Sequence, residues 1–97
     1  MNMIPNIIPW DQVEIGKEYL YEENYFFQGR VKILERLPER NHGYVEYKVK
    51  IVDGNPAKYN GEEWTLGKTI EKKYAAYTND MNFLSLDSAF SYSGVLE

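Results

Sequence analysis

The chain has 97 residues, which is enough for one domain with a single hydrophobic core and too few for two. Hydrophobic residues make up 43% of the chain and charged residues 27%, a composition that excludes an intrinsically disordered protein. Cysteine is absent, which excludes disulfides and thiolate chemistry, and the net charge of −4 argues against general binding to nucleic acid phosphates.

The chain starts with an apolar arm that we expect to be irregular and packed across the domain. Its apolar residues are Ile4, Ile7, Ile8 and Trp10, with Pro5 and Pro9 beside them. Residues 10–13 fit a single helical turn. Gly16 then precedes a strand at about residues 18–22.

Residues 23–29 resemble the Glu-Asn-Leu-Tyr-Phe-Gln-Gly sequence that tobacco etch virus protease cuts, with Tyr25 and Phe26 at the two positions that differ. The residues that follow argue for a native strand rather than an engineered linker. Every second residue from Phe27 to Ile33 belongs to one face of the segment, and the polar residues Gln28, Arg30 and Lys32 lie between them. This alternation is typical of a half-buried strand. We therefore predict a strand at residues 26–36.

The second half of the chain continues this pattern. Residues 38–43 have the composition of a turn, and residues 44–52 alternate as a third strand. After a loop at 53–61, residues 62–66 form a short strand. Residues 69–77 fit a helical face or a strand, and we favour the strand. Residues 83–86 are predicted as a last strand, and 87–97 as a loose tail.

The spacing of these strands predicts a mainly β protein, a small barrel of five to six antiparallel strands. Residues 1–97 are one domain, with the barrel at about 13–86. The pattern of residues 13–19, 29–33 and 44–52 resembles the small SH3-like barrels of bacterial and phage proteins. That resemblance implies a protein encoded by a phage or another mobile element. The predicted core residues are Val31, Ile33, Tyr47, Val49, Ile51 and Trp64.

Groups for catalysis or metal binding are few. His42 is the only histidine and lies in the predicted turn, where a side chain is usually solvated. Asp53 and Asn55 resemble the start of a calcium loop, but Ala57 and Tyr59 occupy positions where further oxygen ligands are needed. We therefore expect no enzymatic activity, no cofactor and no metal.

A basic face is the first candidate binding site. If residues 26–36 and 44–52 form a hairpin centred on about residue 40, Lys32 lies opposite Lys48 and Arg30 opposite Lys50. A register shifted by two residues keeps these four cations on one face, whereas a shift of one residue is disfavoured. Like charges placed directly opposite each other are destabilising, so these four cations need compensation. Carboxylates of Glu62, Glu63 and Glu71 are one source of compensation, and an anionic partner is the other.

Exposed aromatic rings are the second candidate. The chain has nine tyrosines, and a core of this size cannot bury all of them. We single out Tyr25, Tyr44 and Tyr59, because exposed aromatic rings are enriched at protein interfaces and also stack on single-stranded nucleic acid.

These features favour a non-enzymatic interaction module that binds another protein, with nucleic acid binding through a local basic face as the alternative. Residues 1–9 lack the basic start and long apolar core of a signal peptide. No apolar run reaches the roughly 18 residues of a membrane-spanning helix. We therefore expect a cytoplasmic protein that does not contact membranes.

Overall fold

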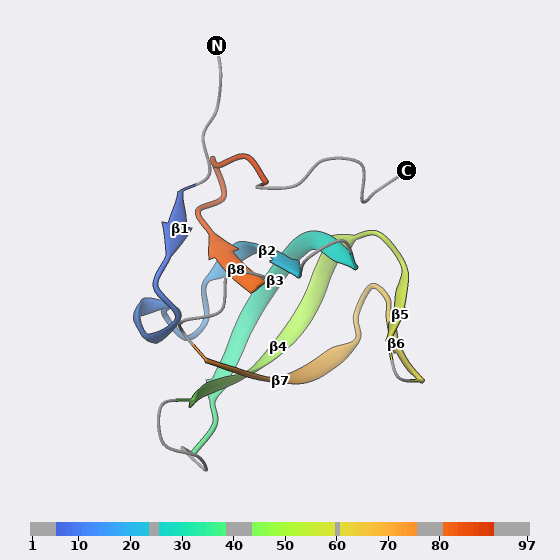
Figure 1. Ribbon diagram of the computed structural model, residues 1–97, viewed down its shortest axis with the longest axis horizontal. Helices are drawn as coiled ribbons and strands as arrows, with labels where there is room; N and C mark the ends of the chain where they lie inside the picture. Colours follow the sequence, from blue (N-terminus) through green and yellow to red (C-terminus); the bar gives the residue numbers. More distant parts are fainter. Residues whose placement is uncertain (1–5, 24–25, 39–43, 60, 76–80, 91–97) are drawn as a thin grey trace.

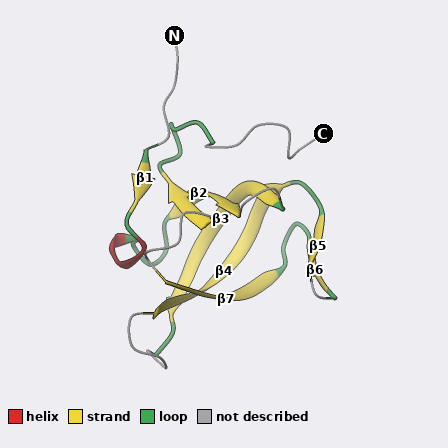
Figure 2. Ribbon diagram, in the orientation of Figure 1, coloured by secondary structure: helices red, strands yellow, loops and turns green. Residues whose placement is uncertain are grey.

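Strands supply nearly all of the regular structure (Figure 2). The computed structural model describes residues 6–23, 26–38, 44–59, 61–75 and 81–90. Its elements are β1 (Ile7–Ile8), the 3₁₀ turn η1 (Trp10–Gln12), β2 (Glu18–Glu23), β3 (Phe27–Arg36), β4 (Tyr44–Gly54), β5 (Ala57–Tyr59), β6 (Glu62–Trp64), β7 (Thr69–Ala75) and β8 (Met81–Leu84). The predicted mainly β fold is confirmed. Within the described ranges, no helix has the length and apolar character needed to cross a membrane.

Six of the strands form one antiparallel sheet in the order β1-β8-β2-β3-β4-β7. Figure 1 shows β3 and β4 running side by side through the middle of the molecule, with β2 and β8 near one end and β7 near the other. Strands β5 and β6 form a separate two-stranded sheet at the side. Among the described residues, β1 and β7 are the two edges of the large sheet.

The inner face of the six-stranded sheet, defined here as the face that carries Tyr21 and Val31, holds the main core. Alternation along β3 and β4 places every second side chain on this face. The six predicted core residues are all confirmed, because none is more than 2% exposed: Val31, Ile33, Tyr47, Val49, Ile51 and Trp64. Burial also raises the pKa of the Tyr47 hydroxyl, since the charged phenolate is disfavoured away from water.

Two tryptophans pack near Tyr21 in this core. Trp10, from η1, lies 4.4 Å from Phe83 and 6.3 Å from Tyr21 between ring centroids. Trp64, from β6, lies 6.3 Å from Tyr21 and 5.3 Å from Phe27. Trp10 is further fixed because its Nε1 donates a hydrogen bond to the Met81 carbonyl. The arm and the small sheet therefore each contribute one large ring to the core of the large sheet.

The structure departs from the sequence prediction in several elements. The arm expected to be irregular contributes β1, in which Ile7 pairs with Leu84 and Ile8 with Phe83. Strand β5 was not predicted. Thr69–Ala75 is a strand, as favoured. Of the tail predicted at 87–97, residues 87–90 are described, and there the Asn6 amide donates a 2.6 Å hydrogen bond to Ser88 Oγ.

The register between β3 and β4 also differs from the prediction. Ile33 lies opposite Val49 rather than Tyr47, a shift of two residues that keeps the same faces together. Irregularities near each end of the pairing leave Leu34 on β3 and Val52 on β4 without an opposite residue. As a result Lys32 lies opposite Lys50 rather than Lys48, and the predicted pairing of Arg30 with Lys50 was wrong.

Candidate binding site on the outer face

The opposite face of the large sheet, here called the outer face, carries side chains in three rows. Residues directly opposite across neighbouring strands share a face, so the register defines each row. The first row is Asn82, Glu22 and Gln28; the second is Ile7, Leu84, Leu20, Arg30 and Asp53; the third is Glu18, Lys32, Lys50 and Thr69. Consecutive rows are two residues apart along a strand, or roughly 6.6–6.8 Å.

The first row is polar and yet buried. Glu22 is fully buried, and Gln28 and Asn82 are each less than 9% exposed. Asn82 Nδ2 donates a 2.9 Å hydrogen bond to Glu22 Oε2. A buried carboxyl group requires such donors, because burial without them is unfavourable. This row therefore belongs to the packed structure and not to an open surface.

The third row contains the two lysines that face each other. Lys32 and Lys50 are directly opposite across β3 and β4, and both are exposed. Neither forms an ion pair with any residue in the described parts of the chain. We call these two residues the lysine pair. Lys17 provides a contrast, because its ammonium donates a 2.7 Å hydrogen bond to Glu14 that raises the pKa of Lys17.

The other two predicted cations each have a carboxylate partner. Arg30 Nε lies 3.1 Å from Glu18 Oε1, and Lys48 Nζ lies 3.8 Å from Glu35 Oε1. The Arg30 contact has the distance of an ion pair without hydrogen-bond geometry, since Nε is buried without an acceptor among the described residues. Both pairs are partly exposed, so each contributes little to stability.

The carboxylates that compensate these cations differ from those predicted. Glu62 and Glu63 lie on β6, in the small sheet, where Glu62 Oε1 accepts a hydrogen bond from Trp64 Nε1 and Glu63 is opposite Lys58. Glu71 is opposite Lys48 in the β4–β7 register, and its side chain lies outside what the structure describes. The sequence prediction missed Glu35 because the β3–β4 register differs from the predicted one, and it missed Glu18 because it did not consider the pairing of β2 with β3.

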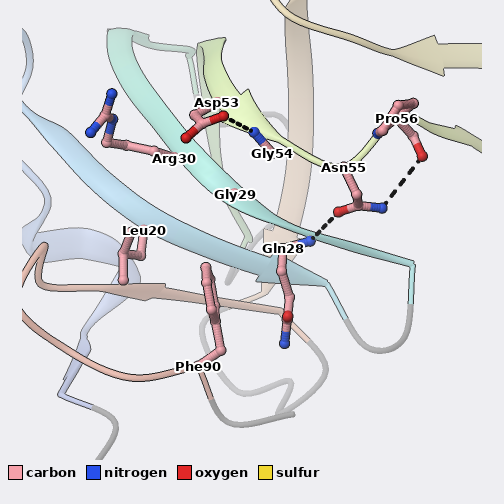
Figure 3. Close-up of a pocket in the computed structure, with 9 residues that line it drawn as sticks. All are labelled: Leu20, Gln28, Gly29, Arg30, Asp53, Gly54, Asn55, Pro56 and Phe90. Atoms are coloured by element: carbon pink, nitrogen blue, oxygen red, sulfur yellow. Dashed lines mark hydrogen bonds between the residues drawn. The ribbon is translucent and has the colours of Figure 1, made fainter. Parts of the chain in front are cut away.

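A pocket opens on the outer face beside Arg30 (Figure 3). Its floor is backbone, because Gly29 and Gly54 lie directly opposite each other. A Cβ added to Gly29 would collide with the Asp53 carbonyl, and one added to Gly54 would lie 2.7 Å from Phe27 Cζ. Gly54 also has φ of +141°, which favours glycine. The Phe27 ring on the inner face thus requires both glycines, and their backbone forms the floor of the pocket on the outer face.

Hydrogen bonds from Asn55 hold one wall of this pocket. Asn55 Oδ1 accepts from the Gln28 amide at 2.8 Å, and Asn55 Nδ2 donates to the Phe26 carbonyl at 3.1 Å. The side-chain amide thereby extends the β3–β4 pairing beyond the end of β4. Asp53 Oδ1 accepts from the Gly54 amide at 2.9 Å. Asp53 and Asn55, considered above as a calcium loop, thus hydrogen-bond to backbone groups.

Leu20 and Phe90 supply the apolar part of the pocket. Figure 3 shows the Phe90 ring between Leu20 and Gln28, on the side of the pocket away from Asn55. Pro56 completes the lining, and the cavity has a volume of about 410 Å³. The sequence prediction missed this pocket because Phe90 lies in the segment predicted to be a loose tail. The Asp-Gly-Asn-Pro turn at residues 53–56 was the available signal for the opposite wall.

Several predicted site residues lie outside what the structure describes. This holds for Tyr25 and His42, and for the side chains of Tyr44 and Tyr59, whose backbones lie at the start of β4 and the end of β5. Among the described residues, no three His, Asp or Glu side chains are grouped closely enough to hold a metal ion.

Comparison with known proteins gives no relative for this chain. No family model, curated protein or solved structure matches it. The functional argument therefore rests on the outer face alone.

Proposed function

We propose that this protein is a non-enzymatic interaction module whose outer face binds an acidic segment of another protein. The observation that carries the proposal is the lysine pair. Two exposed ammonium groups directly opposite each other repel, and such a pair is unfavourable by roughly 0.2–1 kcal/mol. An acidic partner removes this repulsion on binding, whereas Arg30 and Lys48 are already within ion-pair distance of Glu18 and Glu35.

A protein partner fits the charge balance better than nucleic acid does. The whole chain carries a net charge of −4, so a long phosphate backbone would meet repulsion outside a small basic area. A short acidic segment needs only local complementarity. The predicted resemblance to SH3-like barrels belongs to the same proposal, as does the phage or mobile-element origin that it implies.

The test uses a displayed library of random dodecapeptides, selected against the protein at low salt. Peptides rich in Asp and Glu should be enriched. Affinity of the best synthetic peptide should fall at least fivefold when Lys32 and Lys50 are both replaced by Gln. A matched double variant, Lys58→Gln with Lys68→Gln, changes the net charge equally at two exposed positions outside the pair and should bind like the wild type.

The same variants separate the alternatives. Equal binding by both double variants would show that only net charge matters and would remove the lysine pair from the proposal. A single-stranded oligodeoxynucleotide that bound more tightly than every selected peptide, and lost affinity in the Lys32 and Lys50 variant, would assign the cations to a phosphate backbone. Stability offers a further check, since relief of repulsion should leave the Lys32 and Lys50 variant as stable as the wild type or more stable at low salt.

A further inference from the structure

The pocket beside Arg30 lies one row from the lysine pair on the same face of the sheet. Arg30 and Lys32 are two residues apart on β3, so roughly 6.6–6.8 Å separates the pocket's edge from the first ammonium-bearing residue. An extended peptide advances about 3.3 Å per residue. One short segment can therefore reach both features at once.

The chemistry of the pocket indicates what enters it. The floor is the backbone of Gly29 and Gly54, and Leu20, Phe90 and Pro56 present apolar surface around it. The volume of about 410 Å³ is near the lower limit for ligand pockets, which suits one large side chain better than a cofactor. The Phe90 ring beside this floor favours an aromatic side chain, because aromatic rings pack in offset or edge-to-face arrangements.

The polar walls orient the ligand. Arg30 lies at the rim, its side chain 42% exposed, where a guanidinium group can stack on an aromatic ring. Asp53 lies opposite Arg30 and is exposed, so it repels acidic residues on its side of the pocket. Charge complementarity thus directs the acidic residues of the segment toward Lys32 and Lys50.

We propose that the pocket binds an aromatic side chain of the partner, and that this residue lies about two positions from an acidic pair that contacts Lys32 and Lys50. The inference rests on the proposed function, because the acidic part of the motif requires the lysine pair. It adds a defined recognition motif: an aromatic anchor, a spacer of about one residue, then Asp or Glu.

The test uses two synthetic peptides that differ only at the anchor, Gly-Ser-Trp-Gly-Asp-Glu-Ser-Gly and the same peptide with Ala in place of Trp. The Trp peptide should bind the wild-type protein at least tenfold more tightly. Leu20→Gln should reduce the affinity of the Trp peptide to that of the Ala peptide. It should leave the affinity of the Ala peptide unchanged. Leu86→Gln makes the same change at an exposed leucine outside the pocket and should affect neither peptide.

Amide chemical shifts of the wild-type protein give a readout that does not depend on how well the variants fold. The Trp peptide should shift the Gly29 and Gly54 amides through its ring current, and the Ala peptide should not. Equal affinity of the two peptides, or shifts confined to other residues, would overturn the anchor while leaving acidic binding to the lysine pair intact. No binding of either peptide to the wild type would overturn both proposals.

Discussion

The inner and outer faces of the six-stranded sheet are both largely buried around β2, but by different chemistry. On the inner face, aliphatic and aromatic side chains such as Val31 and Ile51 are at most 1% exposed. On the outer face, Glu22 is equally buried and is joined by Asn82, with Phe90 packed nearby over Leu20 and Gln28. A polar residue in an alternating strand is therefore not always a solvent-facing residue.

The comparison shows that buried apolar and buried polar side chains need different surroundings. Apolar side chains gain free energy from leaving water wherever they pack, at about 25 cal/mol per Å². A buried carboxyl group gains nothing unless particular donors are present. The inner face should therefore respond to lost volume, and the outer face to lost hydrogen bonds.

The largest effect is expected on the inner face. Ile33→Ala or Ile51→Ala removes a side chain that is no more than 1% exposed and leaves a cavity. The free energy of unfolding should fall by about 2–5 kcal/mol, measured by urea denaturation. Small domains are stable by only about 5–15 kcal/mol, so a loss of this size is a large part of the total. Unchanged urea midpoints in both variants would mean that the two faces are inverted.

On the outer face, Asn82→Ala removes a donor from the buried Glu22 carboxyl group. The free energy of unfolding should fall by about 1–3 kcal/mol, because a buried polar group is left with an unmet acceptor. Asn6→Ala is the matched control: Asn6 Nδ2 hydrogen-bonds Ser85 Oγ at an exposed position, where a loss within about 0.5 kcal/mol is expected. Equal losses in the two variants would show that the Glu22 row behaves as a solvated surface.

The inner face contains one polar group whose response depends on pH. The Tyr47 hydroxyl donates a 2.7 Å hydrogen bond to the Trp10 carbonyl, and burial raises its pKa. The unfolded chain therefore loses this proton at lower pH than the folded protein does. The contribution of Tyr47 to the free energy of unfolding is fully present below the pKa of about 10 in the unfolded chain. It is lost as the pH rises through the pKa of the folded protein.

Tyr47→Phe tests that dependence. At pH 7 the variant should be less stable by about 0.5–1.5 kcal/mol, the usual net value of one hydrogen bond. Between pH 9 and pH 11 it should lose less stability than the wild type, and the difference isolates Tyr47 because the other tyrosines titrate in both proteins. Parallel pH curves for the two proteins would count against a buried hydroxyl at this position.

The last prediction is that a protease has no effect on the folded protein. Tobacco etch virus protease should leave the folded protein intact at Gln28–Gly29, because both residues are buried and β3 is paired with β2 and β4. Mass spectrometry after prolonged incubation provides the measurement. Ile33→Ala, which favours opening, should be cut faster. Rapid cleavage of the wild type would instead indicate an exposed linker.

The sequence was sufficient for the inner face but not for the outer one. Alternation at Val31, Ile33, Val49 and Ile51 identified the buried face because hydrophobic side chains must leave water. The shift of register could not be read from that pattern, since a slip of two residues keeps every apolar side chain on the same face. The same slip changed which charges meet, and it explains why Lys32 faces Lys50.

The outer pocket was beyond prediction for a different reason. Its walls come from segments far apart in the chain, and Phe90 becomes a lining residue only because the segment after β8 packs against β2 and β3. Local composition carries no information about such a contact. The burial of Glu22 could not be predicted either, because its donor, Asn82, is distant in the sequence.

The position of β8 between β1 and β2 also affects how the protein is made. Synthesis proceeds at roughly 5–20 residues per second, so several seconds pass between the synthesis of β2 and the synthesis of β8, the strand that pairs with its free edge. A nascent chain in that interval presents open backbone groups that another chain could pair with. Glu22 and Glu23 lie on that edge strand, and acidic side chains on an open strand edge disfavour pairing with another chain until Met81–Leu84 have been made.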